Sequence, residues 1–339
     1  MNTNARFNPR PPARALLTFL LAAPAFWTMT ATSRGQIFVT NANFGGRYGW
    51  IGEYTTSGAT VNASLISMLD GPLGTALSGE NLFVANSNSG TIGEYTTSGA
   101  TVNASLVSGG VNHPSAIALS GGDLFVASGT TNSGTIGEYT TSGATVNAAL
   151  ITGLSNPLGI AVYGGNLYVL NYSNGTNGTV GEYTTSGAIV NASLISGLND
   201  ARGIAVYQGN LFVSNVGNGG GRISEYTTFG ATVNPSLISG LQEPRGVAVS
   251  GGDLFVANLG ADGPYGTIGE YTTSGAAVNA ALVTGLRSAE GITVVSVGSV
   301  PEPSTLALAS CGLAVAAVVS VRRRQRRLKT NHLSLTMVN

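Results

Sequence analysis

The sequence is poor in the residue types that carry most catalytic and metal chemistry. Among 339 residues there is one cysteine, Cys311, and there are two histidines, His113 and His332. A single cysteine excludes an intrachain disulfide, and the lack of clustered Cys and His excludes the common zinc sites. No serine lies in a G-x-S-x-G pattern, so a nucleophile-elbow hydrolase is not indicated. We therefore expect no catalytic constellation, no metal centre and no cofactor, with stability supplied by packing.

Charge is scarce as well, since Asp, Glu, Lys and Arg make up 9% of the chain. Residues 36–300 contain five Arg against fourteen Asp and Glu, a net charge of −9. An acidic body of this kind argues against a nucleic-acid partner, which attracts Lys and Arg. Glycine is abundant instead, with 49 residues, and 43% of the chain is hydrophobic. This composition favours an all-β protein rich in turns and large enough to bury a core.

The N-terminus, residues 1–35, is typical of a secretory signal peptide. Arg6, Arg10 and Arg14 precede the apolar run ALLTFLLAAPAFW, and small residues follow it. A charged start, a short apolar segment and a small-residue cleavage region are the three parts of such a signal. The alternative is a first helix of the core. The run is too short to span a bilayer comfortably.

The C-terminus has the composition of a short membrane anchor. A linker (299–304) leads into an apolar segment (305–321) and then a basic tail (322–339). About sixteen residues make a helix of roughly 24 Å, which is short for a permanent span. Basic residues at its end would stay in the cytoplasm and leave the acidic body outside. A plain tail anchor is one interpretation of this pattern.

The order of three features at this end resembles a PEP-CTERM sorting signal. Pro301, Glu302 and Pro303 precede the apolar helix, and an arginine cluster follows it: Arg322, Arg323, Arg324, Arg326 and Arg327. The resemblance implies processing by an exosortase-type enzyme, transient membrane anchoring, and export to the cell envelope, cell surface or extracellular matrix. The twelve residues 328–339 depart from the family, whose members usually stop at the basic cluster.

Between these ends, one sequence motif, the repeated phrase, occurs six times. Close copies of IGEYTTSGATVNASLI begin at residues 51, 92, 136, 180, 223 and 268. Each repeat contains four short segments rich in Val, Ile, Tyr and Thr and bounded by Gly, Ser or Asn, as in 159–165, 166–171, 179–185 and 189–195. These are strand signatures, and a period of 41 to 45 residues is typical of propeller blades.

The two ends of the repeat region are out of phase with the repeats. The segment 36–40 matches the second of the four segments of a repeat, and no first segment precedes it. The segment 291–295 matches the first, and no second, third or fourth segment follows it. If these pair, the chain makes six complete sets of four. We therefore predict a six-bladed β-propeller over residues 36–298, closed by pairing of its N- and C-terminal strands. A seven-bladed ring and an open solenoid are the alternatives.

The starts of the first strands also resemble NHL-type six-bladed propellers. The segments PLGTAL (72–77), PLGIAV (157–162) and PRGVAV (244–249) carry this resemblance. Blades of that family often carry Asp after the second strand, where this chain has Asn41, Asn86, Asn171, Asn215 and Asn258. The resemblance therefore implies a less charged face here and a weaker capacity for metal.

Loop lengths indicate where binding could occur. The separation between the second-strand Val and the third-strand Glu varies from 10 to 14 residues, whereas the other hairpin turns keep one length. In a propeller the variable loops share one face, and loops on a rigid scaffold carry function. Aromatic and polar side chains there could bind sugars, and the candidate binding face is Tyr48, Trp50, His113, Tyr172, Arg202, Arg245 and Tyr265. Free drift of loop sequence would give the same variation.

These observations favour an exported, non-catalytic propeller that binds or scaffolds polysaccharide or surface proteins. The alternative is a lactonase-like, metal-dependent hydrolase or lyase. It would hold weakly bound calcium at the ring centre with the asparagines named above and with Asp200, Glu243 and Glu290. The six Glu-Tyr pairs of the repeated phrase are assigned to structure, because a catalytic carboxylate pair needs two different surroundings. We expect the Tyr to pack between blades and the Glu to bond neighbouring backbone.

Overall fold

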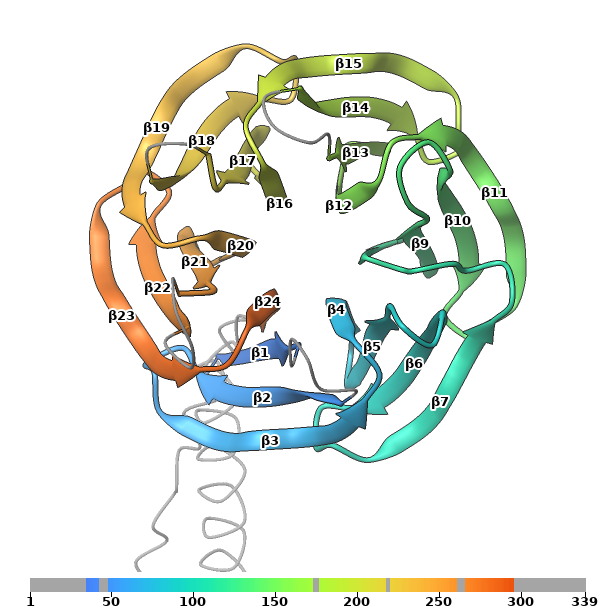
Figure 1. Ribbon diagram of the computed structural model, residues 1–339, viewed down its shortest axis with the longest axis horizontal. Coiled ribbons are helices and arrows are strands. Elements are labelled where there is room, and N and C mark those ends of the chain that lie inside the picture. Colours follow the sequence, from blue (N-terminus) through green and yellow to red (C-terminus); the bar gives the residue numbers. More distant parts are fainter. Residues whose placement is uncertain (1–34, 43–47, 173–176, 218–219, 261–265, 296–339) are drawn as a thin grey trace, which may run out of the picture. The chain divides into compact units, whose positions relative to one another are not determined.

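Six four-stranded antiparallel sheets are arranged as blades around a central axis (Figure 1). The computed structural model describes residues 35–42, 48–172, 177–217, 220–260 and 266–295, which belong to one compact unit. Every regular element in these ranges is a β-strand. The predicted signal peptide, sorting motif, membrane helix and basic tail lie outside the described residues. Within the described ranges, no helix has the length and apolar character needed to cross a membrane.

From the axis outward, the strands of five blades follow each other in sequence order, and in the closing blade the last strand β24 lies inside β1, β2 and β3. The innermost strands are β4 (Pro72–Ser78), β8 (Ala116–Ser120), β12 (Pro157–Tyr163), β16 (Ala201–Tyr207), β20 (Pro244–Ser250) and β24 (Ala289–Val295). The second strands are β1 (Gln36–Asn41), β5 (Asn81–Asn86), β9 (Asp123–Ser128), β13 (Asn166–Asn171), β17 (Asn210–Asn215) and β21 (Asp253–Asn258). The third strands are β2 (Gly49–Thr55), β6 (Thr91–Thr96), β10 (Gly134–Thr140), β14 (Gly178–Thr184), β18 (Gly221–Thr227) and β22 (Gly266–Thr272). The outermost strands are β3 (Thr60–Leu69), β7 (Thr101–Ser108), β11 (Thr145–Leu154), β15 (Ile189–Leu198), β19 (Thr232–Leu241) and β23 (Ala277–Leu286).

The ring closes as the sequence predicts. Strand β24 pairs antiparallel with β1, with Gln36 opposite Val295, so the closing sheet has the order β24-β1-β2-β3. The buried hydroxyl of Thr40 donates to the carbonyl of Leu73 at 2.7 Å and accepts from the amide of Gly291 at 2.7 Å. The closing blade is thereby bonded to the blade that follows it around the ring, and the six-bladed prediction is confirmed.

The hydrophobic core consists of six clusters, each between two neighbouring blades. At the closing junction, Tyr54 packs with Phe255 and Ile268 of the preceding blade. Tyr139 packs in the same way with residues of the β4–β7 blade. The prediction that the repeated tyrosines pack between blades is therefore confirmed.

Close approaches in the third strands explain part of the repeated phrase. A Cβ added to Gly93 would lie 2.7 Å from Cε2 of Tyr95, because the tyrosine ring folds back over its own strand. In the β16–β19 blade Ser224 replaces this glycine, and Tyr226 is only half-buried. At the outer rim, Gly99 has a φ of +89° and leaves no space for a Cβ next to the carbonyl of Leu65 in the neighbouring blade. Packing thus requires glycine at the outer-rim turn of each repeat, and at the third-strand position wherever the tyrosine ring folds back over its strand.

The repeated asparagine of the outermost strands protects an exposed sheet edge. Oδ1 of Asn62 accepts the backbone N–H of Ser64 at 3.1 Å, at an irregularity in the β2–β3 register. The same bond recurs in the other five outermost strands. An edge strand with free N–H groups invites pairing with other chains, and this side chain occupies one such group in each blade.

The repeated glutamates behave differently from the prediction. In three of the six blades they accept hydrogen bonds from side-chain amides of the second strand rather than from backbone. The donors are Gln36 to Glu53 at 2.7 Å, Asn166 to Glu182 at 2.7 Å and Asn210 to Glu225 at 2.8 Å. In these three blades the expectation of backbone partners was wrong, because the first residue of the second strand reaches across to the third-strand carboxylate.

Candidate functional site

The two kinds of variable connection lie on one face of the ring, which we call the loop face. Backbone amides that follow the second strand bond to carbonyls that precede the first strand, as in Val216 to Asp200 and Leu259 to Glu243, both at 3.1 Å. At the opposite ends of the strands, the turn after the third strand bonds to the turn after the first strand. An example is the backbone amide of Thr97, which donates to the carbonyl of Glu80 at 2.8 Å. The length variation seen in the sequence is therefore confined to the loop face.

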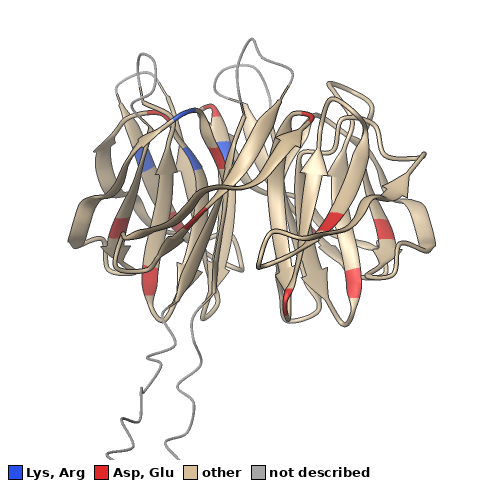
Figure 2. Ribbon diagram, turned by 90° about the horizontal axis from the view of Figure 1, so that it is seen from below, with Lys and Arg blue, Asp and Glu red and all other residues tan. Residues whose placement is uncertain are grey.

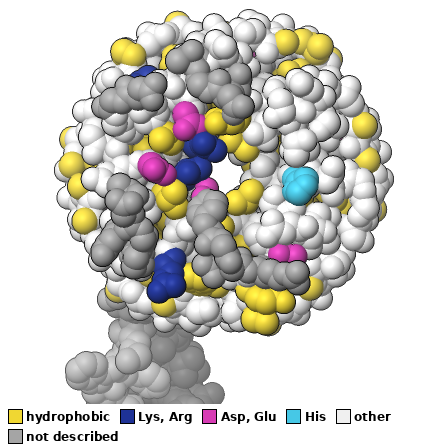
Figure 3. Space-filling model, viewed as in Figure 1, with side chains coloured by type: hydrophobic (Ala, Val, Ile, Leu, Met, Phe, Trp, Pro, Cys, Tyr) yellow, Lys and Arg dark blue, Asp and Glu magenta, His cyan; other side chains and the backbone are white. Residues whose placement is uncertain are grey.

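A cavity of about 310 Å³ lies on the ring axis, where the innermost strands begin. It is lined by three consecutive residues from the start of each of the six innermost chain segments. Since these strands begin directly after the loop-face connections, the cavity lies next to the loop face. Figure 3 shows side chains of both charges gathered around the centre of the face. Figure 2 shows Arg segments toward one end of the blades, whereas Asp and Glu segments occur at both ends.

The residue at the first lining position of each segment differs from blade to blade. Around the ring it is occupied by Leu73, Ser115, Leu158, Arg202, Arg245 and Glu290. Three neighbouring blades thus present two leucines and a serine, and the next three present two cations and one anion. We call Arg202, Arg245 and Glu290 the charged half of the cavity.

A second ring of residues lies two positions before the first lining residue of each blade. Each member has a positive φ, and the occupants are Gly71, His113, Asn156, Asp200, Glu243 and Ser288. Non-glycine residues seldom adopt this left-handed conformation, and clusters of them occur at functional sites. Five of the six positions carry a side chain despite the strain. The conformation turns Asp200 and Glu243 back toward the arginines that follow them.

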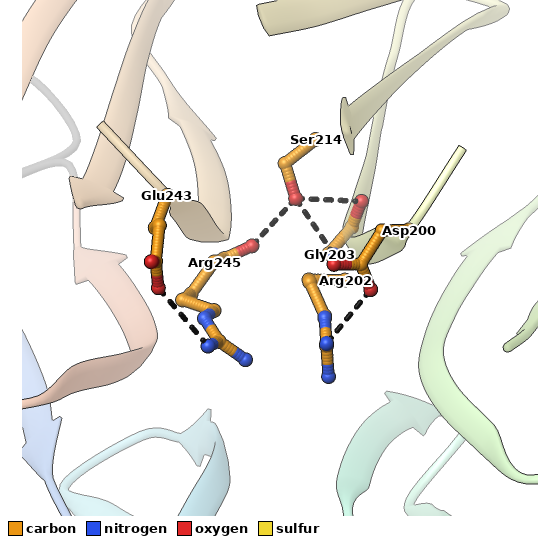
Figure 4. A network of polar contacts seen from close by, with 6 residues as sticks. All are labelled: Asp200, Arg202, Gly203, Ser214, Glu243 and Arg245. Carbon is orange, nitrogen blue, oxygen red and sulfur yellow. Dashed lines mark hydrogen bonds and ion pairs between the residues drawn. The ribbon is translucent and has the colours of Figure 1, made fainter. Parts of the chain in front are cut away.

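Each arginine of the charged half has a carboxylate partner two residues earlier in the chain. Nη2 of Arg202 lies 2.7 Å from Oδ1 of Asp200, and Nη2 of Arg245 lies 3.4 Å from Oε2 of Glu243 (Figure 4). The guanidinium of Arg202 also lies over the ring of Tyr172, with its Cζ 4.6 Å from the ring centroid. A cation over an aromatic face is attracted to it. These contacts hold both arginines in fixed positions beside the cavity.

Ser214 fixes the spacing between the two arginine strands. Its buried hydroxyl donates to the carbonyl of Arg245 at 2.6 Å and accepts from the amide of Gly203 at 2.8 Å (Figure 4). Strands β16 and β20 are thereby joined at the level of the cavity. Sequence inspection missed this residue. Comparison of the six second strands would have shown a serine where four blades have Ala or Leu.

Glu290 has no ion-pair or hydrogen-bond partner among the described residues, and its Oε1 is buried. Burial raises the pKa of its carboxyl group; Arg245 and Arg202 lower it, and Glu243 raises it. Nε of Arg202 and Nε of Arg245 are also buried without partners in the described part of the chain. The charged half therefore contains donors and an acceptor whose hydrogen bonding is incomplete.

The cavity does not fit a divalent cation. In the described ranges, no three His, Cys, Asp or Glu side chains lie close enough together to hold a metal. Two guanidinium groups reach the same space and would repel a cation. The asparagines that end the second strands do not line the cavity; they are buried, and Asn41 and Asn215 donate to carbonyls of their own strands. The structure thus places this part of the expected calcium site elsewhere.

The candidate residues divide into two groups. Arg202 and Arg245 line the cavity, and Tyr172 supports Arg202. Tyr48 and His113 are exposed and Trp50 is half-buried, and none of these three lines the cavity. Tyr265 lies outside the described residues. The repeats contain the signal that would have separated the groups, because the cavity-lining residues occupy one equivalent position in the six copies.

Comparison with known families decides the nature of the C-terminus. Residues 299–324 match the PEP-CTERM protein-sorting motif. The chain carries a PEP-CTERM sorting signal. This signal implies export and sorting to the cell envelope, with exosortase processing and anchoring through the C-terminus. No curated protein matches this chain.

Solved structures confirm the propeller fold. A chain of the nidogen/laminin complex is 16% identical with a TM-score of 0.61, over 77% of this chain and 98% of its own length. A putative TolB from Agrobacterium tumefaciens is 12% identical with a TM-score of 0.56, over 78% and 99%. A gluconolactonase from Xanthomonas campestris is 12% identical with a TM-score of 0.52, over 65% and 78%. At such identities the similarity extends to the fold alone.

Proposed function

We propose that this chain is an exported, envelope-sorted, non-catalytic propeller that binds surface or extracellular polysaccharide at its loop face. One observation carries the proposal: a sorting signal is joined to a ring whose variable loops surround a cavity with incomplete hydrogen bonding. Propeller scaffolds hold such loops rigidly, so the loop face can vary without loss of the core. In this proposal residues 1–35 are the signal peptide, and 305–321 are the membrane helix of the sorting signal.

The lactonase-like alternative is not favoured by the cavity. The similarity to a gluconolactonase is one of fold, and the two arginines are poorly suited to hold a catalytic cation. An assay of lactone hydrolysis by the full-length chain, with and without added calcium or zinc, tests the non-catalytic part of the proposal. Turnover that depends on added metal would overturn it.

Retention on polysaccharide tests the binding part of the proposal. The full-length chain is incubated with extracellular polysaccharide from its own host, with and without calcium, and the bound fraction is measured. In a variant, the β1–β2 and β21–β22 loops are replaced by the four-residue β5–β6 loop, residues 87–90. The matched control is Ser98→Ala in a turn on the opposite face. We expect retention to fall in the loop variant and not in the control; equal retention by both would overturn the assignment to the loop face.

The sorting signal can be tested separately. Replacement of the five arginines between residues 322 and 327 by Gln removes the charge that fixes the cytoplasmic end of the helix. We expect an unprocessed, larger form to accumulate on immunoblots. The control is Lys329→Gln, which changes the charge of the tail outside the matched motif. Normal processing of the arginine variant would contradict the proposed role of the cluster.

A further inference from the structure

We propose that the central cavity binds one uncharged sugar residue through its hydroxyl groups. The inference rests on the proposed function and adds to it the place of recognition and the chemical class of the ligand. Arg202, Arg245 and Glu290 bond to the hydroxyls, and the opposite half of the cavity packs against the C–H surface of the ring.

The size of the cavity suits a single sugar ring. At about 310 Å³ it lies near the lower limit of small-molecule sites. It is lined by all six innermost chain segments and lies at the centre of the ring. A polysaccharide strand lying flat across the ring would not enter such a space, whereas one terminal residue or one side-branch residue would.

The incomplete hydrogen bonding of the charged half favours hydroxyl groups. The buried Nε atoms of Arg202 and Arg245 are donors without partners, and Oε1 of Glu290 is an acceptor without a partner, among the described residues. A hydroxyl both donates and accepts, so neighbouring hydroxyls on one ring satisfy the two kinds of group together. A simple anion would serve only the arginines, and a simple cation would serve only the carboxylate.

The balance of charge favours an uncharged ligand. Both arginines are already paired, with Asp200 and Glu243, and Glu290 adds a third carboxylate to the same cluster. An anionic ligand would therefore increase an existing negative excess in a partly buried site. A cationic ligand would meet two guanidinium groups. Either charged form pays an electrostatic penalty that a neutral ring avoids.

Most of the remaining wall of the cavity is apolar, although Thr75 and Ser115 also line it. Leu73, Ile117, Leu158 and Ile160 line it from three neighbouring blades. A pyranose ring has polar edges and C–H surfaces, so it matches a site in which hydrogen-bonding groups face aliphatic side chains. This division into two halves arises from the differences among repeats at one equivalent position.

The test uses sugar probes that differ in the configuration of their hydroxyls or in the group at C6. The full-length chain is titrated by calorimetry with the methyl glycosides of glucose, galactose and mannose. The sugar that binds most tightly is then compared with its uronate, which carries a carboxylate at C6, and with its 6-amino derivative. We expect millimolar binding of at least one neutral glycoside. The charged counterparts should bind at least about ten-fold more weakly, the factor expected for loss of one favourable polar contact.

The repeats themselves supply the variants. Arg245→Leu and Glu290→Leu introduce the residue that already stands at the equivalent positions 73 and 158, and Glu290→Gln keeps the side-chain shape. Each variant should weaken binding at least about ten-fold. The control Ser98→Ala lies in a turn on the face opposite the cavity and should leave binding unchanged. If a leucine variant fails to fold, binding of the same glycoside by Glu290→Gln tests the role of the carboxylate instead.

Several results would overturn the inference. Tighter binding of the uronate or of the amine would show that the site selects charge. Unchanged binding by Glu290→Gln and Arg245→Leu would place the sugar elsewhere. Absence of binding by all three glycosides, with polysaccharide retention still dependent on the loops, would refute the cavity site and leave the proposed function standing.

Discussion

Replacement of Asp123 by asparagine should stabilise the propeller at neutral pH. Asp123 begins β9 at the place where three other blades have an amide that donates to the third-strand glutamate. Its negative charge instead faces Glu138, whose pKa is raised first by burial and then by Asp123. The β20–β23 blade repeats this arrangement with Asp253 and Glu270. Asparagine would remove the repulsion and restore the hydrogen bond.

The size of the effect follows from the blades that already contain the amide. There the donor and acceptor are separated by 2.7 to 2.8 Å, a short hydrogen bond to a carboxylate. Such a bond contributes about 1.5–3 kcal/mol when buried. Since Asp123 and Glu138 are both partly exposed, solvent screening reduces this to about 1 kcal/mol. In a domain of this size, about 1 kcal/mol corresponds to a rise of about 2–4 °C in Tm.

Urea unfolding at pH 7 and pH 4 measures the change. At pH 7 Asp123→Asn should raise the free energy of unfolding by about 1 kcal/mol. At pH 4, below the raised pKa of Glu138, the carboxyl is protonated and the advantage should shrink. Asp123→Asn and Asp253→Asn lie in non-adjacent blades, so their effects should add. The reverse change Asn166→Asp should destabilise by a similar amount.

An unchanged or lower stability of Asp123→Asn at pH 7 would refute this reasoning. The same holds if the gain persists undiminished at pH 4, because it would then not depend on the ionised glutamate. A stabilising Asn166→Asp would show that the amide bond to Glu182 contributes nothing.

Three further outcomes follow from the structure. Burial raises the pKa of five glutamates above 4.5, so the folded state binds protons more tightly than the unfolded state. Tm should therefore rise as the pH is lowered from 7 toward 5. A Tm that falls steadily as the pH is lowered over this window would contradict this reasoning. These groups are Glu53, Glu138, Glu225, Glu270 and Glu290. Gly93→Ala forces a Cβ against the ring of Tyr95 and should destabilise by about 1–3 kcal/mol in chemical denaturation, with a neutral result ruling out the close approach. Thr40→Val removes both hydroxyl bonds at the ring closure and should lower stability by about 2 kcal/mol, with faster amide exchange in β24; exchange equal to wild type would show that closure does not depend on them.

The architecture could be predicted from the sequence because its determinants are local and repeated. Each blade consists of short strands joined by turns, so one pattern of Val, Ile, Tyr, Thr and Gly is written six times. The offset of residues 36–40 and 291–295 indicated closure without knowledge of any long-range contact. The sorting signal is likewise a contiguous pattern, from Pro301 to the arginine cluster.

The candidate site could be predicted only in part. Tyr172, Arg202 and Arg245 were identified as loop-face residues, but so were Tyr48, Trp50 and His113, which do not line the cavity. Composition and loop length indicate the face on which a side chain lies. They do not give its distance from the ring axis.

The sequence by itself determined the number of blades, their closure and the sorting signal, because each depends on patterns within a few residues. Tertiary structure alone decided that Arg202, Arg245 and Glu290 share one cavity, although more than forty residues separate each from the next. Equivalent positions converge because the ring brings every innermost strand to the same axis. Their electrostatics were decided there too, since the left-handed turns at Asp200 and Glu243 pair two of the charges and leave Glu290 without a partner among the described residues.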